Sequence, residues 1–363
     1  MIFDLHNEGL VFALTHGVDF FAGGAGRQSF AEQLVRGGAR GLFAAIGTSP
    51  LFQGEAAFTR ALEEIEQMKA ALTAPRSRNP FALHTSLAAV VAHRDDGSIP
   101  VALALEGGFP LNSNPYNVGR LAAAGVTRMT LTHFTSPGWA GSERDGESNG
   151  LLPLGEDVVR AMNDSAMIVD VAHGSTQTIV DACRVSRHPV IYSHGGLRAI
   201  AKTPRAIHAR AMHAIAATGG IIGISVFPDH LRPRLPHDDS ATQRFWQEAR
   251  AIETGGGDAG SRFRALHHHT LTKFPIPTHL PPLALMVDHV LQAVSVVGED
   301  HVAIGTDFDG VPFACAGIDD FTKTPALLRC LAERGLGAET IAKIAHGNVM
   351  RVITAVAGKP ISP

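Results

Sequence analysis

Eight short runs of apolar and β-branched residues, separated by longer helical patterns, place the strongest constraint on the fold of this chain. This alternation is typical of βα units arranged around a parallel sheet. Eight such units favour a closed (β/α)8 TIM barrel over an open doubly wound sheet, and barrels of this class take roughly 200 to more than 400 residues. Neither a Gly-x-Gly-x-x-Gly turn after a strand nor a Walker A motif occurs. The predicted strands are Met1–His6, Arg40–Gly47, Pro100–Glu106, Arg128–His133, Met167–His173, Pro189–His194, Gly220–Phe227 and His301–Asp307.

The whole chain, residues 1–363, is predicted to be one barrel domain with a long insertion, residues 228–282, between strands seven and eight. An insertion at this point is expected to lie over the active-site face. It contains a helical pattern at Ala241–Glu253 and the run His267-His268-His269, for which solvated surface is favoured over a metal site. The run Gly23-Gly24-Ala25-Gly26 is interpreted as a mobile loop over the barrel mouth. The other predicted helices are Glu55–Leu72, Phe81–Ala92, Asn117–Ala124, Gly155–Asn163, Ser175–Cys183, Ala206–Ala217, Pro282–Val297 and Ala338–Ala357.

Composition excludes several classes of protein. A formal net charge of −3 provides neither the basic field of a nucleic-acid-binding protein nor a polybasic patch for a membrane surface. No stretch approaches the ~20 apolar residues of a membrane span, and no signal peptide precedes the first strand, so no membrane anchor and a cytoplasmic location are expected. Cys183, Cys315 and Cys330 lie far apart and are interpreted as small apolar residues.

Ionisable residues stand at the ends of six of the predicted strands. They are His6 with Glu8, Glu106, His133, His173, His194 and Asp307. The carboxyl ends of all strands in such a barrel meet at one rim, where the active site lies. A single histidine at a strand end is more often structural, but four histidines and several acids at one rim favour a common site.

These residue types suit a pair of divalent ions. Imidazole nitrogens and carboxylate oxygens are ligands that Zn²⁺ prefers, and Mn²⁺, Co²⁺ or Fe²⁺ fit the same donors. His6 and Glu8 are two residues apart, so in an extended segment they face the same side and can hold one ion. Glu106 can bridge two ions, with His173 and His194 on the second. The pattern therefore predicts a metal-dependent hydrolase. A serine hydrolase built on Ser193 is disfavoured, because no Gly-x-Ser-x-Gly elbow surrounds it.

Five motifs taken in order give a more specific indication. They are Leu105-Glu106-Gly107-Gly108, Leu131-Thr132-His133, Val169-Asp170-Val171-Ala172-His173, Tyr192-Ser193-His194 and Gly305-Thr306-Asp307-Phe308-Asp309-Gly310. In this order and spacing the chain resembles the membrane dipeptidase (renal dipeptidase) family, metallopeptidase family M19 of the amidohydrolase-like barrels. The resemblance runs from the first strand to the terminal helix.

The resemblance implies a zinc-dependent dipeptidase that hydrolyses dipeptides, L-Xaa-D-Xaa pairs included, through a hydroxide bridging two metal ions. It implies His6, Glu8, Glu106, His173 and His194 as metal ligands, and pairing of the chain as a homodimer. By the same resemblance Asp307 and His133 are catalytic: Asp307 moves the proton, and His133 contacts the substrate and polarises the carbonyl. Arg205 is implied to bind the terminal carboxylate of the substrate, for which its planar guanidinium is suited.

Two departures from the family pattern keep alternatives open. The family usually has His-x-Asp in the first strand, whereas this chain has His6-Asn7-Glu8, and the region around Gly195-Gly196 and Ala206 lacks the usual small polar residues and Asn. The alternatives are a related amidohydrolase that acts on a non-dipeptide amide or a modified peptide, and a metal-poor non-catalytic homologue in which Glu8 has weakened the first metal site.

Overall fold

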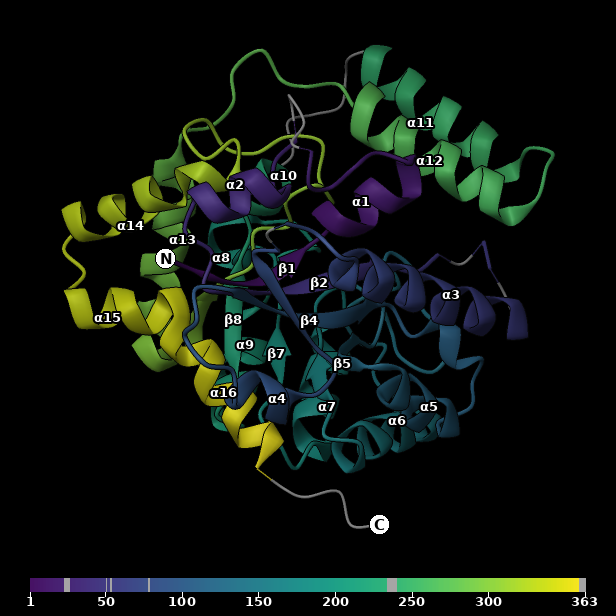
Figure 1. The fold of residues 1–363 in the computed structure, drawn as a ribbon, viewed down its shortest axis with the longest axis horizontal. Helices are drawn as coiled ribbons and strands as arrows, with labels where there is room; N and C mark the ends of the chain where they lie inside the picture. Colours follow the sequence, from purple (N-terminus) through teal and green to yellow (C-terminus); the bar gives the residue numbers. More distant parts are fainter. Residues whose placement is uncertain (23–26, 50, 53, 78, 234–239, 359–363) are drawn as a thin grey trace.

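All eight predicted strands form, and every neighbouring pair is parallel. The computed structural model describes residues 1–363 except 23–26, 50, 53, 78, 234–239 and 359–363. Within these residues the strands follow the order β1-β2-β4-β5-β6-β7-β8-β9, with β3 attached to β4 (Figure 1). The strands are β1 Phe3–Asn7, β2 Gly41–Gly47, β3 Phe81–His84, β4 Ile99–Glu106, β5 Val126–Thr130, β6 Ile168–Asp170, β7 Ile191–Tyr192, β8 Ile221–Ile224 and β9 Val302–Ile304.

The first and last strands close the sheet into a barrel. Asn7 and Phe308 form a parallel bridge just beyond β9, and the N–H of Asp307 donates to the carbonyl of His6 at 3.0 Å. The buried carboxylate of Asp4 completes this seam, because it accepts from the backbone N–H and the hydroxyl of Thr306 at 2.8 and 2.6 Å. The nearly closed ring of eight parallel strands confirms the predicted (β/α)8 fold.

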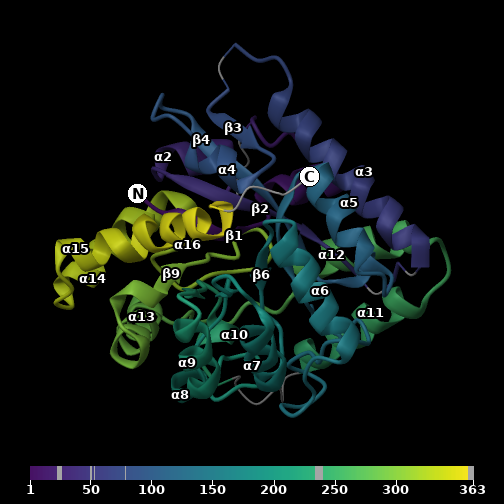
Figure 2. The same cartoon turned by 90° about the horizontal axis from the view of Figure 1, so that it is seen from below.

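Helices surround the sheet as the alternating pattern predicts (Figures 1 and 2). None of the helices within the described ranges is long and apolar enough to cross a membrane. The α-helices are α1 Gly9–His16, α2 Ala31–Arg36, α3 Gly54–Thr73, α4 Leu87–Val91, α5 Tyr116–Ala124, α6 Pro153–Asp164, α7 Thr176–Val185, α8 Arg198–Ala201, α9 Ala209–Ala217, α10 Pro228–Leu231, α11 Ser240–Thr254, α12 Ala259–Lys273, α13 Leu283–Val297, α14 Thr324–Glu333, α15 Ala338–Ala342 and α16 Asn348–Ala357. Shorter turns are η1 Phe109–Leu111, η2 Glu299–His301, η3 Phe321–Lys323 and the π-helical η4 Lys343–Gly347.

The helix predicted at Phe81–Ala92 is wrong in its first half. The segment from Phe81 to His84 instead forms β3, which pairs in register with β4 from Ile99. A helix begins only after Ser86, whose side chain accepts from the N–H of Ala89 and caps α4. The two large apolar residues of β3, Phe81 and Leu83, are two positions apart, a strand spacing that the longer helical pattern obscured.

The terminal helix predicted at Ala338–Ala357 is interrupted. The π-helical turn η4 separates α15 from α16, and α14 before them has no counterpart among the predicted elements. The apolar face of α16 packs against the end of the barrel opposite α1 (Figures 1 and 2). This helix therefore covers the barrel end remote from the predicted site.

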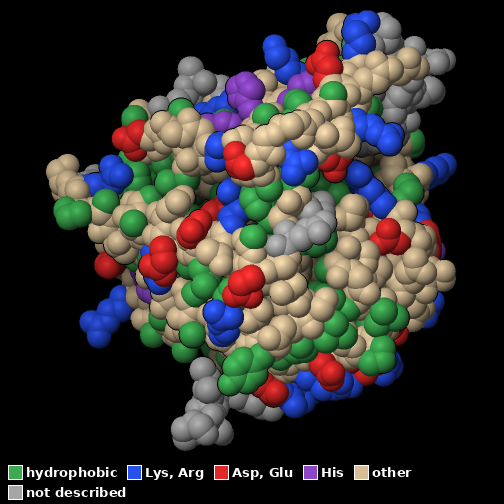
Figure 3. All heavy atoms as spheres, turned by 90° about the vertical axis from the view of Figure 1, so that its right-hand side faces the viewer, with side chains coloured by type: hydrophobic (Ala, Val, Ile, Leu, Met, Phe, Trp, Pro, Cys, Tyr) green, Lys and Arg blue, Asp and Glu red, His purple; other side chains and the backbone are tan. Residues whose placement is uncertain are grey.

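The insertion between β8 and β9 folds into a helical hairpin of α11 and α12, which contacts α1 (Figure 1). The predicted helix at Ala241–Glu253 corresponds to α11. The prediction that His267-His268-His269 is solvated surface is wrong except for His268. His269 is buried and bonds the carbonyl of Phe245 at 3.2 Å, and His267 lies 2.9 Å from a ring nitrogen of His16. Figure 3 shows histidine side chains gathered on this side of the molecule. The loop predicted at residues 23–26 lies outside the described residues.

The barrel interior changes from apolar to polar along its axis. Near α16 the inward-facing strand residues form an apolar cluster: Phe3, Leu5, Phe43, Ala102, Ala104, Ile168, Ile191, Ile221 and Ala303. Above it lies a fully buried ion pair between Arg128 of β5 and Asp170 of β6. Asp170 also accepts from Thr130 at 2.9 Å and from the backbone N–H groups of Ala172 and Ser193 at 3.0 and 3.1 Å. This polar layer joins β5, β6 and β7 directly beneath the strand ends.

We expect Asp170→Ala to lower the free energy of unfolding by about 3–5 kcal/mol, because it leaves the Arg128 guanidinium buried without its counterion. Urea denaturation followed by circular dichroism measures the change. The matched control is Asp164→Ala, which removes an exposed pair with Arg187 (side chains 67% and 56% exposed) and is expected to cost at most about 1 kcal/mol. Equal effects of the two substitutions would contradict a structural role for the buried pair.

Candidate metal centre

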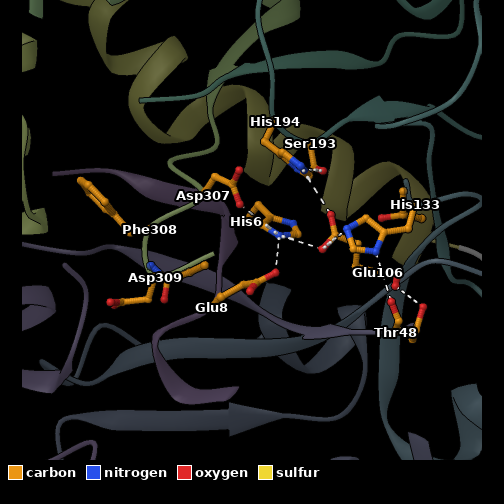
Figure 4. Close-up of polar contacts among 12 residues, drawn as sticks. His6, Glu8, Thr48, Glu106, His133, Ser193, His194, Asp307, Phe308 and Asp309 are labelled. Carbon is orange, nitrogen blue, oxygen red and sulfur yellow. Dashed lines mark hydrogen bonds and ion pairs between the residues drawn. The ribbon is translucent and has the colours of Figure 1, made fainter. Parts of the chain in front are cut away.

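The predicted site residues converge at the carboxyl end of the barrel. Figure 4 shows those among them that it labels: His6, Glu8, Glu106, His133, His194 and Asp307. His6 belongs to β1, Glu8 precedes α1, and Glu106 ends β4. The remaining residues lie in the loops that follow strands: His133 after β5, His173 after β6, His194 and Arg205 after β7, and Asp307 after β9. Three groups of these residues have ligand atoms within 4.8 Å of one another: His6 with His194 and Asp307, Glu106 with His173 and His194, and His6 with Glu8 and Glu106.

Glu106 occupies the centre of the site, and its two carboxylate oxygens face different partners. One oxygen lies 3.2 Å from Nε2 of His173 and 3.4 Å from Nε2 of His194. The other lies 3.6 Å from Nε2 of His6 and 3.7 Å from Nε2 of His133. Burial opposes ionisation of Glu106, but these imidazoles bring its pKa well below the usual value. A carboxylate with this arrangement can bridge two cations.

Two further carboxylates face the same nitrogen of His6 as Glu106 does. Nε2 of His6 is 3.5 Å from Oε1 of Glu8 and 3.7 Å from Oδ1 of Asp307. Burial and the charge of Glu106 raise the pKa of Glu8 well above its usual value and that of Asp307 to about 8. These shifts reflect several acids crowded in a dry site, and a bound cation would reverse them by supplying opposite charge.

The spacing of these donor atoms fits divalent ions. In a tetrahedral site with bonds of about 2.1 Å, neighbouring ligand atoms are separated by about 3.4 Å. The contacts of Glu106 with His173 and His194, the 3.1 Å between those two Nε2 atoms, and the contacts of His6 with Glu8 and Glu106 all lie near this length. The donors of the chain therefore match two adjacent cation sites that share Glu106. Which of these residues bind metal stays a prediction.

Two of the site residues adopt backbone conformations that non-glycine residues rarely take. His173 has φ 64° and Asp307 has φ 65°. Each conformation turns the chain sharply after its strand and costs of order 1–3 kcal/mol. The sharp turns direct both side chains over the barrel end.

His133 lies at the edge of the site. Its Nδ1 donates to the carbonyl of Thr48 at 3.1 Å, so Nε2 faces Glu106. Burial lowers the pKa of His133 to about 4. Its ring stacks on that of Phe134, with centroids 4.1 Å apart, and the Phe134 side chain is half-exposed. His133 therefore borders both the buried donors and solvent.

Arg205 approaches the site from the loop between α8 and α9. Its guanidinium donates to the hydroxyl of Tyr192 at 2.6 Å and to the carbonyl of His194 at 3.1 Å, and lies 3.4 Å from Nε2 of His173. The Tyr192 hydroxyl in turn donates to the Arg205 carbonyl at 2.9 Å. A Cβ at Gly195 would come within 2.3 Å of this hydroxyl, so the absence of a side chain there makes room for the tyrosine.

Several residues to which the sequence reasoning gave no role in the metal site support it. Arg128 lies behind His6, with its Nη2 3.2 Å from Nδ1 of that ring. The Ser193 hydroxyl is buried 2.9 Å from Nδ1 of His194, which makes it a neighbour of the predicted ligand. Glu143 lies 3.3 Å from Nδ1 of His173. Burial opposes ionisation of Glu143, but His173 and Arg205 lower its pKa below the usual value. Of these three residues only Arg128 could have been suspected from the sequence, because it places a charged side chain in a predicted barrel strand.

The family model of membrane dipeptidases, peptidase family M19, matches residues 1–359. Among curated proteins, an uncharacterized dipeptidase of Schizosaccharomyces pombe is 28% identical over 253 residues, which cover 69% of this chain and 51% of that protein. Dipeptidase tcpJ of Claviceps purpurea is 30% identical over 234 residues, which cover 64% of this chain and 45% of that protein. The chain thus spans about half the length of the curated relatives it matches.

Solved structures share the fold over nearly the whole chain. The probable dipeptidase PvdM from Pseudomonas aeruginosa superposes with a TM-score of 0.79 at 24% identity, covering 99% of this chain and 96% of that one. A metallopeptidase from Rhodobacter sphaeroides, liganded with a phosphinate mimic of the dipeptide L-Ala-D-Ala, superposes with a TM-score of 0.76 at 20% identity, covering 98% and 99%. At these identities the likeness supports the barrel fold.

We expect Glu106→Ala to lower the metal content of the purified protein by at least one ion per chain, because it removes the carboxylate shared by both cation sites. Inductively coupled plasma mass spectrometry after dialysis with Zn²⁺ measures the content. Glu299→Ala, which removes a surface carboxylate bonded to Lys343, is the control and is expected to retain the wild-type content. Unchanged metal content in Glu106→Ala would exclude the bridging role.

Proposed function

Because the chain belongs to the membrane dipeptidase family, peptidase family M19, we propose that it is a metal-dependent dipeptidase that uses two divalent ions, with zinc as the expected metal. The observation that carries the proposal is the position of Glu106 between two groups of imidazoles, each with ligand-like spacing. Glu8 supports it further: its carboxylate contacts His6 despite the extra methylene. This contact indicates that Glu8 can still serve as a ligand of the first metal ion, which argues against a metal-poor homologue.

We assign the ions to two donor sets that meet at Glu106. His6, Glu8 and Glu106 would hold one ion, and Glu106, His173 and His194 would hold the other. When bound, two such ions would supply the Lewis acidity that water activation and carbonyl polarisation need. The chain itself must then bind the substrate, orient its amide and move the proton.

Arg205 is proposed to bind the carboxylate at the C-terminus of a dipeptide. Its contacts with Tyr192 and the His194 carbonyl hold the guanidinium beside His173, one side of the donor cluster. A substrate with its carboxylate held there places its only amide bond close to the ions. This anchor favours cleavage of the amide nearest the C-terminus. The family to which the chain belongs supports dipeptides as the substrates, and the dipeptide mimic bound by the Rhodobacter sphaeroides relative supports including L-Xaa-D-Xaa pairs among the candidates.

Asp307 is proposed to accept the proton of the attacking water and to deliver it to the leaving amine. Its carboxylate lies over the barrel end, 3.7 Å from His6 and 4.0 Å from His230. His133 is proposed to stabilise the negative oxygen that forms on the carbonyl carbon. Because its Nδ1–H donates to Thr48, donation from Nε2 requires the imidazolium form. Burial opposes that form and lowers the pKa of His133 to about 4, and the charge of Glu106 offsets this only in part, so a negative oxygen on the substrate would have to stabilise the second proton.

We expect the zinc-loaded protein to release free amino acids from members of a panel of L,L and L,D dipeptides. Chelation should abolish the release, and added Zn²⁺ should restore it. Amino-acid analysis measures the products. If the metal-loaded protein cleaves other amides and no dipeptide, the related amidohydrolase is the better description, and inactivity on both classes would contradict a hydrolase.

We expect Asp307→Asn to lower kcat by about 10²–10⁴-fold, the usual contribution of a general acid–base group. Steady-state kinetics on the best dipeptide of the panel measures the change. Asp309→Asn is the matched comparison, because Asp309 is also buried but accepts hydrogen bonds from Gln28 and Ser29. We expect this substitution to lower the stability of the fold and to change kcat little. A near wild-type kcat for Asp307→Asn would refute the assigned role.

A further inference from the structure

Glu143 stands in the loop between β5 and α6, outside the residues that the proposed function uses. Its Oε1 lies 3.3 Å from Nδ1 of His173, on the opposite side of the ring from Glu106. Its Oε2 is buried and has no hydrogen-bond partner within the described part of the chain. A buried carboxyl group with one unpartnered oxygen, placed behind a candidate metal ligand, requires an explanation.

The backbone brings Glu143 to this position through several contacts. Its N–H donates to the carbonyl of His173 at 2.8 Å. Beside it, Ser142 and Gly174 form an antiparallel bridge, and the N–H of Ser175 donates to Gly141 at 3.0 Å. Residues 141–143 therefore run alongside residues 173–175 as a short antiparallel ladder. Because the ladder fixes both backbones, the contact between the two side chains is set by the fold.

This contact determines which nitrogen of His173 carries the proton. A carboxylate only accepts hydrogen bonds, so Glu143 favours the tautomer with the proton on Nδ1. Nε2 then presents its lone pair toward Glu106 and His194, where the second cation site lies. A carboxylate behind a ligating histidine fixes the ring and raises its basicity, and loss of such a partner typically weakens metal binding by about 10–100-fold.

The same side chain also lies near the proposed substrate anchor. Arg205 interacts electrostatically with Glu143, and its Nη2 lies 3.4 Å from Nε2 of His173. Glu143 and the guanidinium thus both neighbour the His173 ring, with the carboxylate at Nδ1 and the guanidinium at Nε2. The negative charge of Glu143 favours the position of the cationic Arg205 beside the metal ligands.

We propose that Glu143 is a positioning residue that holds His173 in the tautomer and orientation required for the second metal ion. The inference rests on the metal site of the proposed function, and it adds a residue of this chain to that site. It requires no contact between Glu143 and substrate or metal.

The test compares Glu143→Gln, Glu143→Ala and Glu143→Asp with the wild type, and it measures metal binding rather than catalysis. Equilibrium dialysis against chelator-buffered Zn²⁺ gives the affinity and number of bound ions, and the visible absorption of Co²⁺-substituted protein reports the ligand geometry. We expect the second ion to bind about 10–100-fold more weakly in the Gln and Ala variants, with the first ion retained. Glu143→Asp, which keeps the charge, should recover part of the affinity.

Glu147→Gln is the matched control. Glu147 lies in the same loop and pairs with Arg198 at the surface, with its side chain 53% exposed. We expect wild-type affinity for both ions. Thermal unfolding of the metal-free proteins identifies any variant that fails to fold, and the isosteric Gln substitution keeps the test informative if Ala does not fold.

The outcomes separate this inference from the proposed function. Equal affinity for both ions in wild type, Glu143→Gln and Glu143→Ala would overturn the positioning role while leaving the dipeptidase proposal intact. A weakened second ion in a protein that cleaves no dipeptide would support the positioning role and contradict the proposed substrate. A wild type that takes up no divalent ion would overturn both.

Discussion

The ion pair between Arg128 and Asp170 is the interaction on which the rest of the site depends. Both side chains are completely buried inside the barrel. Asp170 binds groups from β5, β6 and the start of the loop after β7, and Arg128 reaches the back of His6 in β1. A buried charge is tolerated only when its partners are fixed. The pair therefore fixes the relative positions of four strand ends whose side chains must meet within a few ångströms.

Above this pair the barrel concentrates negative charge. The carboxylates of Glu8, Glu106 and Asp307 surround His6, and each is almost completely excluded from water. Burial of these acids and, after it, their mutual repulsion raise the pKa values of Glu8 and Asp307. Such an arrangement is stable in its ionised form when cations balance it. The electrostatics and the ligand spacing thus both favour a site for divalent cations.

The sequence predicted the barrel and the residues of its rim because both follow from local patterns. An apolar run that ends in His6, Glu106 or Asp307 carries its own evidence for a strand and for the direction of the terminal side chain. β3 was missed because its apolar residues also fit the helical spacing of the segment that follows. Glu143 was missed for a different reason: its partner His173 is 30 residues away, and only the folded ladder between their segments brings the two together. The roles assigned to the rim residues stay predictions until metal binding and kinetics are measured.

The packing of Tyr192 against Gly195 limits which residues can replace the glycine. The hydroxyl that holds Arg205 occupies the volume where a Cβ at position 195 would stand. The same Cβ would lie 2.7 and 2.8 Å from Cε1 and Cζ of the ring, atoms that phenylalanine would keep, and Gly195 has a φ of +148° that side chains rarely adopt. Loss of the hydroxyl alone therefore makes no room at position 195. Glycine stays the only residue that fits there as long as an aromatic ring occupies position 192, so this glycine is tied to the residue that holds the arginine.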